Sequence, residues 1–292
     1  MTPFIQSKIK KFMTQIDEWA GGFLNLEGNT ERALNHNINQ WLDKGEAIYV
    51  QGMNDVRVSS AYESFKQASK VAGTSMTISD FKEVYATELN RLSRKDLTKA
   101  VMLRNNIANN LLGNTDKIYK EFDQFAKESF GLSLQDMTKE FMNKADFYEI
   151  INFTDSSGRM WNPASYAEMW ARTRSSEISS DANRDAMAEY DLDVVLISDH
   201  GTTTPICLQY EGKYFSLFGK TPGLPILDMR PPFHPNCQHT EIPIDERQVA
   251  ENTMLRDNLR RNSKYAVASS DFTKSERKQI DKQKAYSEIN RT

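Results

Sequence analysis

The sequence predicts an α+β protein with a mainly helical N-terminal half, a small α+β domain and a helical C-terminal arm. Apolar residues recur at helical spacing through residues 1–147, which we expect to form a helical domain. Residues 148–244 hold β-rich runs separated by turn residues, and predict a domain of short strands and long ordered loops. Residues 245–292 are polar and rich in Lys and Arg, which favours a solvated or partner-bound helical arm.

The overall composition excludes several classes of protein. A chain of 292 residues is long enough for one large domain or two ordinary ones. A hydrophobic content of 39% with 26% charged residues is typical of a soluble globular protein, and a net charge of -3 argues against a surface that binds nucleic acid throughout. Two cysteines are too few for a disulfide framework, which indicates a reducing compartment. No apolar run is long enough to cross a bilayer, and the first residues lack the pattern of a signal peptide, so we expect neither a transmembrane segment nor a signal peptide.

The first two predicted helices lie in residues 3–25 and in a segment that begins after Asn29 or Thr30. The apolar stripe of the first helix favours packing into a bundle, and its alternative is a membrane-surface or partner-binding helix with a basic face. Gly52 and two adjacent serines make residues 51–60 a predicted break in the second helix.

Two further helices follow, and both have end signals. One is predicted from Ser79, a candidate N-cap, to Gly113, because glycine is common just past helix ends. The next begins at Thr115 and carries an aromatic stripe at helical spacing, which predicts a place in the core. Ser133 with Asp136 resembles a capping box for a short helix that ends near residue 144.

The β-rich part begins with a predicted hairpin, in which residues 148–154 and 159–161 flank a turn. Asn162 followed by Pro163 is a favourable helix start. Three further strands are then expected, a buried one at 193–198 and flanking ones at 213–216 and 240–244.

Ligand-type side chains are concentrated in residues 199–239, which contain both cysteines and three of the four histidines. The fourth, His36, has polar neighbours and is expected to be exposed or locally bonded. Zn²⁺ prefers Cys and His ligands, with a closely spaced group and a more distant one. The candidate metal ligands are Cys207, His234, Cys237, His200 and His239.

The spacing leaves three interpretations open. The first is a structural zinc site, although the sequence contains no Cys-x-x-Cys pair. The second is metal-free packing, in which the cysteines are small buried residues and the histidines bond loop backbone. The third is catalysis by Cys207 or Cys237 beside a histidine that Asp199 orients, but no local signature of a cysteine enzyme or a zinc deaminase is present.

Ordered sequence blocks around this cluster resemble a known family. The blocks of this sequence that carry the resemblance are Ser165-Tyr166-Ala167-Glu168-Met169, Leu196-Ile197-Ser198-Asp199-His200-Gly201, Pro205-Ile206-Cys207, Tyr210-Glu211-Gly212-Lys213-Tyr214 and Pro231-Pro232-Phe233-His234-Pro235-Asn236-Cys237-Gln238-His239. In their order and spacing they resemble the bacteriophage minor capsid protein 2 family and the related Mu F-like head morphogenesis proteins. The resemblance covers residues 162–243.

This resemblance implies a minor structural protein of a tailed-phage virion, present in several copies and without enzymatic activity. It implies a place at the portal vertex or in the capsid interior, and a role in head assembly and in DNA packaging or ejection. The implied partners are the portal protein and the major capsid or other head proteins, and synthesis would occur in the host bacterial cytoplasm. The alternative function is a metal-dependent or cysteine enzyme that is carried in the virion and delivered with the genome.

One feature of the sequence limits the predicted metal site, and another predicts a contact with DNA. Many relatives have a cysteine where this chain has Thr204, so a four-ligand site here would need His200 or His239. The basic segments 8–11 and 256–284 are candidates for salt-dependent contacts with the phosphates of packaged DNA.

Overall fold

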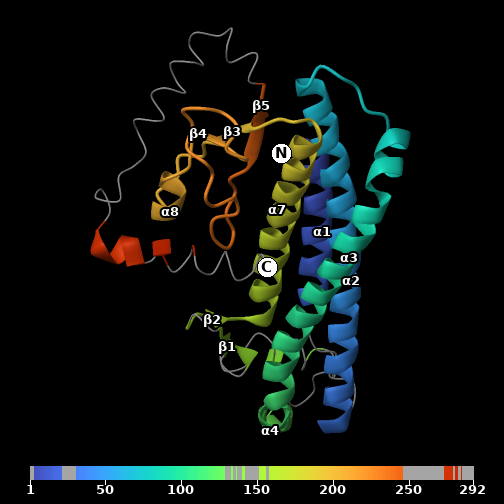
Figure 1. The fold of residues 1–292 in the computed structure, drawn as a ribbon. Coiled ribbons are helices and arrows are strands. Elements are labelled where there is room, and N and C mark those ends of the chain that lie inside the picture. Colours follow the sequence, from blue (N-terminus) through green and yellow to red (C-terminus); the bar gives the residue numbers. More distant parts are fainter. Residues whose placement is uncertain are drawn as a thin grey trace. The chain divides into compact units, whose positions relative to one another are not determined.

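The computed structural model describes residues 3–21, 31–128, 133, 136, 140–141, 151–155, 158–245, 273–278, 280–281 and 284. Its elements, labelled in Figure 1, are α1 (Pro3–Gly21), α2 (Glu31–Val71), α3 (Ile78–Gly113), α4 (Thr115–Glu128), β1 (Phe153–Thr154), β2 (Met160–Trp161), α7 (Pro163–Glu189), β3 (Val194–Ile197), α8 (Pro205–Leu208), β4 (Tyr214–Ser216) and β5 (Glu241–Ile244). The predicted mainly helical α+β fold is therefore confirmed. Within the described residues, none of the helices has the length and apolar character needed to cross a membrane.

The chain forms two compact units, each built from non-consecutive segments. The helical unit comprises Lys8–Asn54 and Asn90–Ala171, and the sheet unit comprises Met1–Ser7, Asp55–Leu89 and Arg172–Thr292. The division into consecutive domains at residues 147 and 244 stays a prediction.

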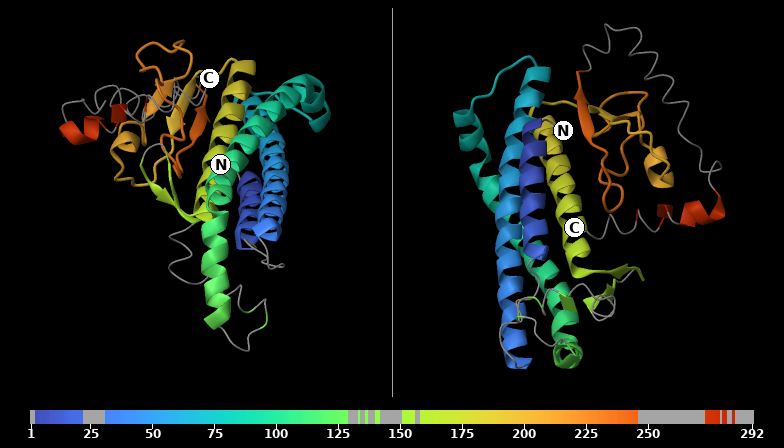
Figure 2. Two further views of the ribbon diagram at one scale, coloured as in Figure 1. Left: turned by 90° about the horizontal axis from the view of Figure 1, so that it is seen from below. Right: turned by 180° about the vertical axis from the view of Figure 1, so that it is seen from behind.

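In the helical unit, α1 lies alongside α2 (Figure 2), and aromatic side chains join them. Trp19 stacks on Trp41 with ring centroids 4.2 Å apart. Each indole N–H donates to the other residue's carbonyl oxygen, at 2.7 and 2.9 Å. Phe12 and Ile16, on the same stripe of α1, are also buried. The apolar stripe of α1 therefore packs inside the protein, as the bundle interpretation predicted.

The predicted break at residues 51–60 is wrong, because α2 runs through this segment without interruption. A Cβ added at Gly52 would lie 2.0 Å from a ring carbon of Phe12, so the glycine allows α1 and α2 to approach closely. Further along, the buried Ser60 hydroxyl lies 2.9 Å from the hydroxyl of Ser179. These residue types serve helix packing here, whereas in isolation they are typical of a turn.

Gly52→Ala is therefore expected to destabilise the helical unit. Alanine has the higher helix propensity by about 1 kcal/mol, but the clash with Phe12 costs about 1–3 kcal/mol. Thermal unfolding followed by circular dichroism measures the net loss. Gly113→Ala is the matched control, because a Cβ there meets no atom within 4 Å. An equal or higher unfolding temperature for Gly52→Ala would contradict the packing role.

The start of α3 differs from the predicted one by two residues. Thr77, not Ser79, caps this helix: its Oγ1 accepts from the backbone N–H of Asp80 at 3.2 Å, and the Asp80 carboxylate accepts from the backbone N–H of Thr77 at 3.0 Å. This reciprocal pair is a capping box with Asp in the third position. The predicted end at Gly113 is confirmed.

The aromatic stripe of α4 is buried, as predicted. Phe122 and Phe125 pack against Phe141 with ring centroids 5.3 and 5.7 Å apart. Farther on, the backbone N–H of Asp136 donates to Ser133 Oγ at 3.2 Å, the bond expected of the predicted cap. Most of the short helix predicted after it lies outside the described residues.

The predicted hairpin is present, with β1 antiparallel to β2 and Phe153 opposite Trp161. The first strand is shorter than the predicted 148–154, because Ile151 is helical and β1 begins at Phe153, while residues 148–150 lie outside the described part of the chain. The N-cap of α7 is also as predicted, since Asn162 Oδ1 accepts from the backbone N–H of Ala164 at 2.9 Å.

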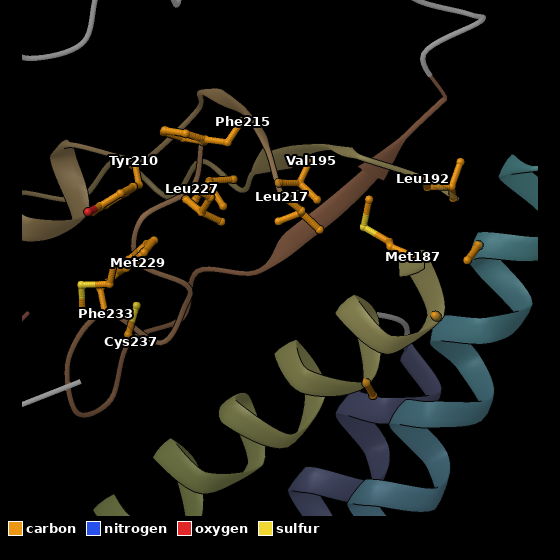
Figure 3. Packing of buried hydrophobic residues seen from close by; sticks show 14 of the residues in the cluster. Met187, Leu192, Val195, Tyr210, Phe215, Leu217, Leu227, Met229, Phe233 and Cys237 are labelled. Atoms are coloured by element: carbon orange, nitrogen blue, oxygen red, sulfur yellow. The ribbon is translucent and has the colours of Figure 1, made fainter. Parts of the chain in front are cut away.

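The sheet unit is built on an antiparallel sheet of order β4-β3-β5, which matches the three predicted strands. The central strand β3 is apolar and largely buried, and its residues share one core with α7 and the loops after β4 (Figure 3). Ile280, in the predicted C-terminal arm, is also buried in this core. That side chain is therefore packed and not solvated, while most of residues 245–292 lie outside the described residues.

Candidate metal centre

Three of the five predicted ligands come together in the sheet unit. The candidate ligand atoms of Cys207, His234 and Cys237 all lie within 4.8 Å of one another. Cys207 is on α8, and the other two lie on the loop that precedes β5. Residues separated by about thirty positions in the sequence thus meet at one point, as the clustering of Cys and His predicted. That they bind a metal stays a prediction.

Local backbone structure positions the three side chains. Pro205 begins the single turn of α8, which turns the Cys207 side chain into the core. The backbone N–H of Cys237 donates to the carbonyl of His234 at 3.1 Å, and this turn brings the two side chains to the same side. Figure 3 shows Cys237 beside Phe233 and Met229 in the core. Cys207 is 0% exposed and Cys237 is 3% exposed, so both thiols are closed to solvent.

The ring of His234 is held by its own loop. Its Nδ1 lies 2.8 Å from the carbonyl oxygen of Pro235, which makes Nδ1 the protonated nitrogen. The lone pair is then on Nε2, the atom left to bind a metal.

A carboxylate and a second imidazole extend the cluster. Nδ1 of His239 lies 3.4 Å from Sγ of Cys237, and its Nε2 lies 3.1 Å from Oε1 of Glu211. The Glu211 carboxylate also accepts from the backbone N–H groups of His200 and Thr202, at 2.6 and 3.0 Å. Glu211 was not among the predicted site residues, although it lies four residues after Cys207 and in one of the sequence blocks.

The two remaining predicted ligands lie beside the group of three. The ring of His200 lies edge-on to the ring of His239, with ring centroids 5.1 Å apart. Nε2 of His200 lies 2.9 Å from the Ser198 hydroxyl. The Asp199 carboxylate accepts from the backbone N–H of Gly201. Glu211, and not Asp199, is the carboxylate in contact with His239, while catalysis at the thiols stays one of the open interpretations.

The charges of the site are coupled through short contacts. The hydrogen bond from Cys207 lowers the pKa of Cys237 and His239 lowers it further, although burial opposes both. The same bond and burial raise the pKa of Cys207. Burial alone would lower the pKa of His239, but its contacts with Cys237 and Glu211 raise it. These contacts therefore favour negative charge on Cys237 over Cys207 and positive charge on His239, which lies beside the Glu211 carboxylate.

The donor set fits a zinc ion. Two thiols and an imidazole are the ligand types that Zn²⁺ prefers, and ligand atoms of a tetrahedral zinc are about 3.6–3.8 Å apart. The ligand atoms lie within 4.8 Å of one another, so shifts of at most about 1 Å would bring them to that spacing. Thr204 directly precedes α8, and its side chain makes no capping hydrogen bond.

Comparison with known protein families gives one match, which covers nearly the whole chain. The model of the family described as phage minor capsid protein 2 matches residues 4–286. The chain belongs to the phage minor capsid protein 2 family. This match extends the resemblance carried by residues 162–243 to both units, including the N-terminal helices, which have no motif of their own. No curated protein and no solved structure matches the chain.

Membership of a phage minor capsid family makes this chain a virion protein, with other head proteins as its partners. The Cys–His cluster therefore lies within a capsid component. Both of its cysteines are buried in the core of the sheet unit, and His234 is half-buried beside them.

Proposed function

We propose that this minor capsid protein has a structural, non-enzymatic role in the phage head, at the portal vertex or capsid interior, in head assembly and in DNA packaging or ejection. In this proposal Cys207, His234 and Cys237 hold a structural Zn²⁺ that joins α8 to the loop before β5. The burial of both thiols carries the structural interpretation, because reactive cysteines are partly exposed and structural ones are not. A site with buried thiols that joins α8 to the loop before β5 suits a structural protein of the particle.

The proposal for the virion is tested by quantitative mass spectrometry of purified particles. We expect the chain in low copy relative to the major capsid protein, in heads purified free of unassembled protein. Reconstruction of the vertex then tests the portal location. Absence of the chain from purified particles would overturn the proposal.

One observation favours a second candidate, an enzyme carried in the virion. Glu211, His239 and Cys237 stand in the order carboxylate, imidazole, sulfur, at 3.1 and 3.4 Å, which is the order of groups that activates a cysteine nucleophile. Phage that carry Cys237→Ser separate the two candidates. Normal particles with lost infectivity would favour the enzyme, whereas misfolding and loss of the chain from particles would favour the structural site.

DNA contact through the basic arms is a further part of the proposal. In α1, Lys10 and Lys11 are exposed. Most of the second arm, residues 256–284, lies outside the described residues. Binding by such arms would weaken steeply with added salt, because it depends on phosphate contacts.

A further inference from the structure

The described residues near the C-terminus, 273–278, 280–281 and 284, are helical or cap a helix, and we call them the C-terminal segment. Residues 245–272 separate this segment in sequence from β5. Thr273 Oγ1 accepts from the backbone N–H of Glu276 at 3.3 Å, and the Glu276 carboxylate accepts from the backbone N–H of Thr273 at 2.7 Å. This pair is a capping box, so the first turn of the segment is stabilised by its own residues.

Two described side chains attach the C-terminal segment to the sheet unit. Ile280 is 6% exposed and belongs to the same core cluster as Cys207 and Cys237. Nζ of Lys284 lies 2.8 Å from Oδ2 of Asp228, in an ion pair that is partly exposed. The segment is therefore held by one buried apolar side chain and by one surface charge pair.

The contact of Lys284 extends to an aromatic ring of the core. The hydroxyl of Tyr210 donates to Oδ1 of Asp228 at 2.8 Å, so this carboxylate joins Tyr210 to Lys284. The ammonium of Lys284 also lies over the Tyr210 ring, 6.0 Å from its centre. The docked segment thus holds Tyr210 through its hydroxyl and through its ring.

Tyr210 in turn contacts both parts of the candidate metal centre. Its backbone N–H donates to the carbonyl of Cys207 at 2.9 Å. Its ring stacks on that of Phe233, with centroids 4.4 Å apart and planes 14° apart, and Phe233 directly precedes His234. Figure 3 shows Tyr210, Phe233 and Cys237 at the same end of the core. A continuous set of contacts therefore joins the C-terminal segment to the thiols.

We propose that the C-terminal segment is a releasable strap, which keeps the two thiols of the candidate metal centre closed to solvent. When the segment is docked, Ile280 fills part of the core and Tyr210 is fixed by Asp228 and Lys284. When it leaves, the place of Ile280 opens into the core that holds the thiols. Because the thiols are 0% and 3% exposed, a metal ion needs an entry path, and release of the strap provides one.

The strength of these attachments suits a strap that opens without unfolding the unit. Burial of one isoleucine side chain shifts an equilibrium on the order of tenfold to a hundredfold. A partly exposed ion pair such as that of Lys284 with Asp228 adds less than about fivefold. The conformational entropy lost by the segment opposes both contributions. Whole domains have folding equilibrium constants of about 10³–10⁸, so the segment leaves the core more often than the sheet unit unfolds.

The test measures how fast iodoacetamide alkylates the two cysteines of the full-length chain, after a chelator has removed any metal. Ile280→Ser with Lys284→Ala removes both attachments and is expected to raise the rate roughly tenfold or more. Lys278→Ala is the matched control, because Lys278 is an exposed lysine of the same segment, and it should keep the wild-type rate. Mass spectrometry follows each cysteine, and circular dichroism confirms that each chain is folded.

Two further measurements apply if one of these chains does not fold. Lys284→Ala alone changes only a partly exposed side chain, and it is expected to raise the rate by roughly two- to fivefold. If the metal-free chain unfolds, the rate at which the zinc-loaded chain releases its ion to a chelator replaces alkylation, with the same expected acceleration in the double variant.

The outcomes separate the strap from the proposed metal site. The role of the strap in metal entry rests on that proposed site, whereas its closure of the thiols does not. Wild-type rates in the double variant, or an equal increase with Lys278→Ala, would overturn the strap. An alkylation rate that rises with urea as steeply as global unfolding would also overturn it, because the thiols would then react in the unfolded chain. Faster alkylation in the double variant of a chain that binds no zinc would overturn the metal site alone.

Discussion

Replacing Cys207 with alanine is expected to abolish zinc binding and to lower the thermal stability of the sheet unit. A ligand that binds only the folded state stabilises it by about 4 kcal/mol when its free concentration is 1,000 times its Kd. The lost sulfur also leaves a small cavity in the core, which costs on the order of 1 kcal/mol. Elemental analysis of the purified chain gives the metal content, and thermal unfolding gives the stability.

A chelator separates the metal contribution from the packing contribution. If zinc is bound, a strong chelator lowers the unfolding temperature of the wild-type chain and leaves that of Cys207→Ala unchanged. Thr204→Cys is the converse variant: it adds a thiol three residues before Cys207, on the same side of the α8 turn, and should tighten metal binding. A wild-type chain without metal, and without response to the chelator, would favour metal-free packing.

The helices and strands were predictable where local pattern and tertiary structure agree. The stripe of α1, the cap at Asn162 and the apolar strand β3 each carry a local signal that the fold uses directly. Residues 51–60 differ because Gly52 and Ser60 act in contacts with distant residues. Gly52 packs against Phe12, and the Ser60 hydroxyl contacts that of Ser179. The residue that explains why a glycine or serine stands at each position therefore lies 40 or more residues away in sequence. A single sequence without tertiary information cannot separate such a glycine from a helix breaker.

The candidate site was predictable in its ligand types but not in its supporting groups. Cys207, His234 and Cys237 were recognised because few other side chains bind zinc. Glu211 was missed because glutamate is common on surfaces, and only the fold brings its carboxylate against His239. The burial of Ile280 was missed for a related reason: one apolar residue in a polar segment gives no periodicity, yet it joins a core formed elsewhere in the chain.

Asp193→Asn is expected to lower the free energy of unfolding of the sheet unit by about 3 kcal/mol at neutral pH. The carboxylate accepts four hydrogen bonds while almost fully buried, and bonds to a charged acceptor contribute about 1.5–3 kcal/mol each without being additive. An asparagine keeps one acceptor oxygen and turns an NH₂ group toward donors on the other side. Either Phe218 or Thr221 then loses its backbone bond, and the 217–227 loop is released at its base.

The effect should depend on pH in a defined direction. Burial alone would raise the pKa of Asp193, but hydrogen bonds from Ser216, Thr221 and Phe218 lower it below its ordinary value. A carboxyl whose pKa is lower in the folded state stabilises the fold fully above its unfolded pKa of about 3.9 and loses that contribution as the pH falls through the folded pKa. The wild-type advantage over Asp193→Asn should therefore be constant from about pH 5 to 8 and shrink below about pH 4.

Asp191→Asn is the matched control for this prediction. Asp191 is exposed, pairs only at the surface with Lys220 and has a positive φ of 53°, which asparagine tolerates well. Urea unfolding of the three chains at pH 7 and pH 3 measures both the size and the pH dependence of the effect. Equal stability of Asp193→Asn and Asp191→Asn at pH 7 would mean that the buried bonds do not hold the loop. A clear loss of stability with Asp193→Asn and none with Asp191→Asn would show that the buried bonds of this carboxylate hold the 217–227 loop.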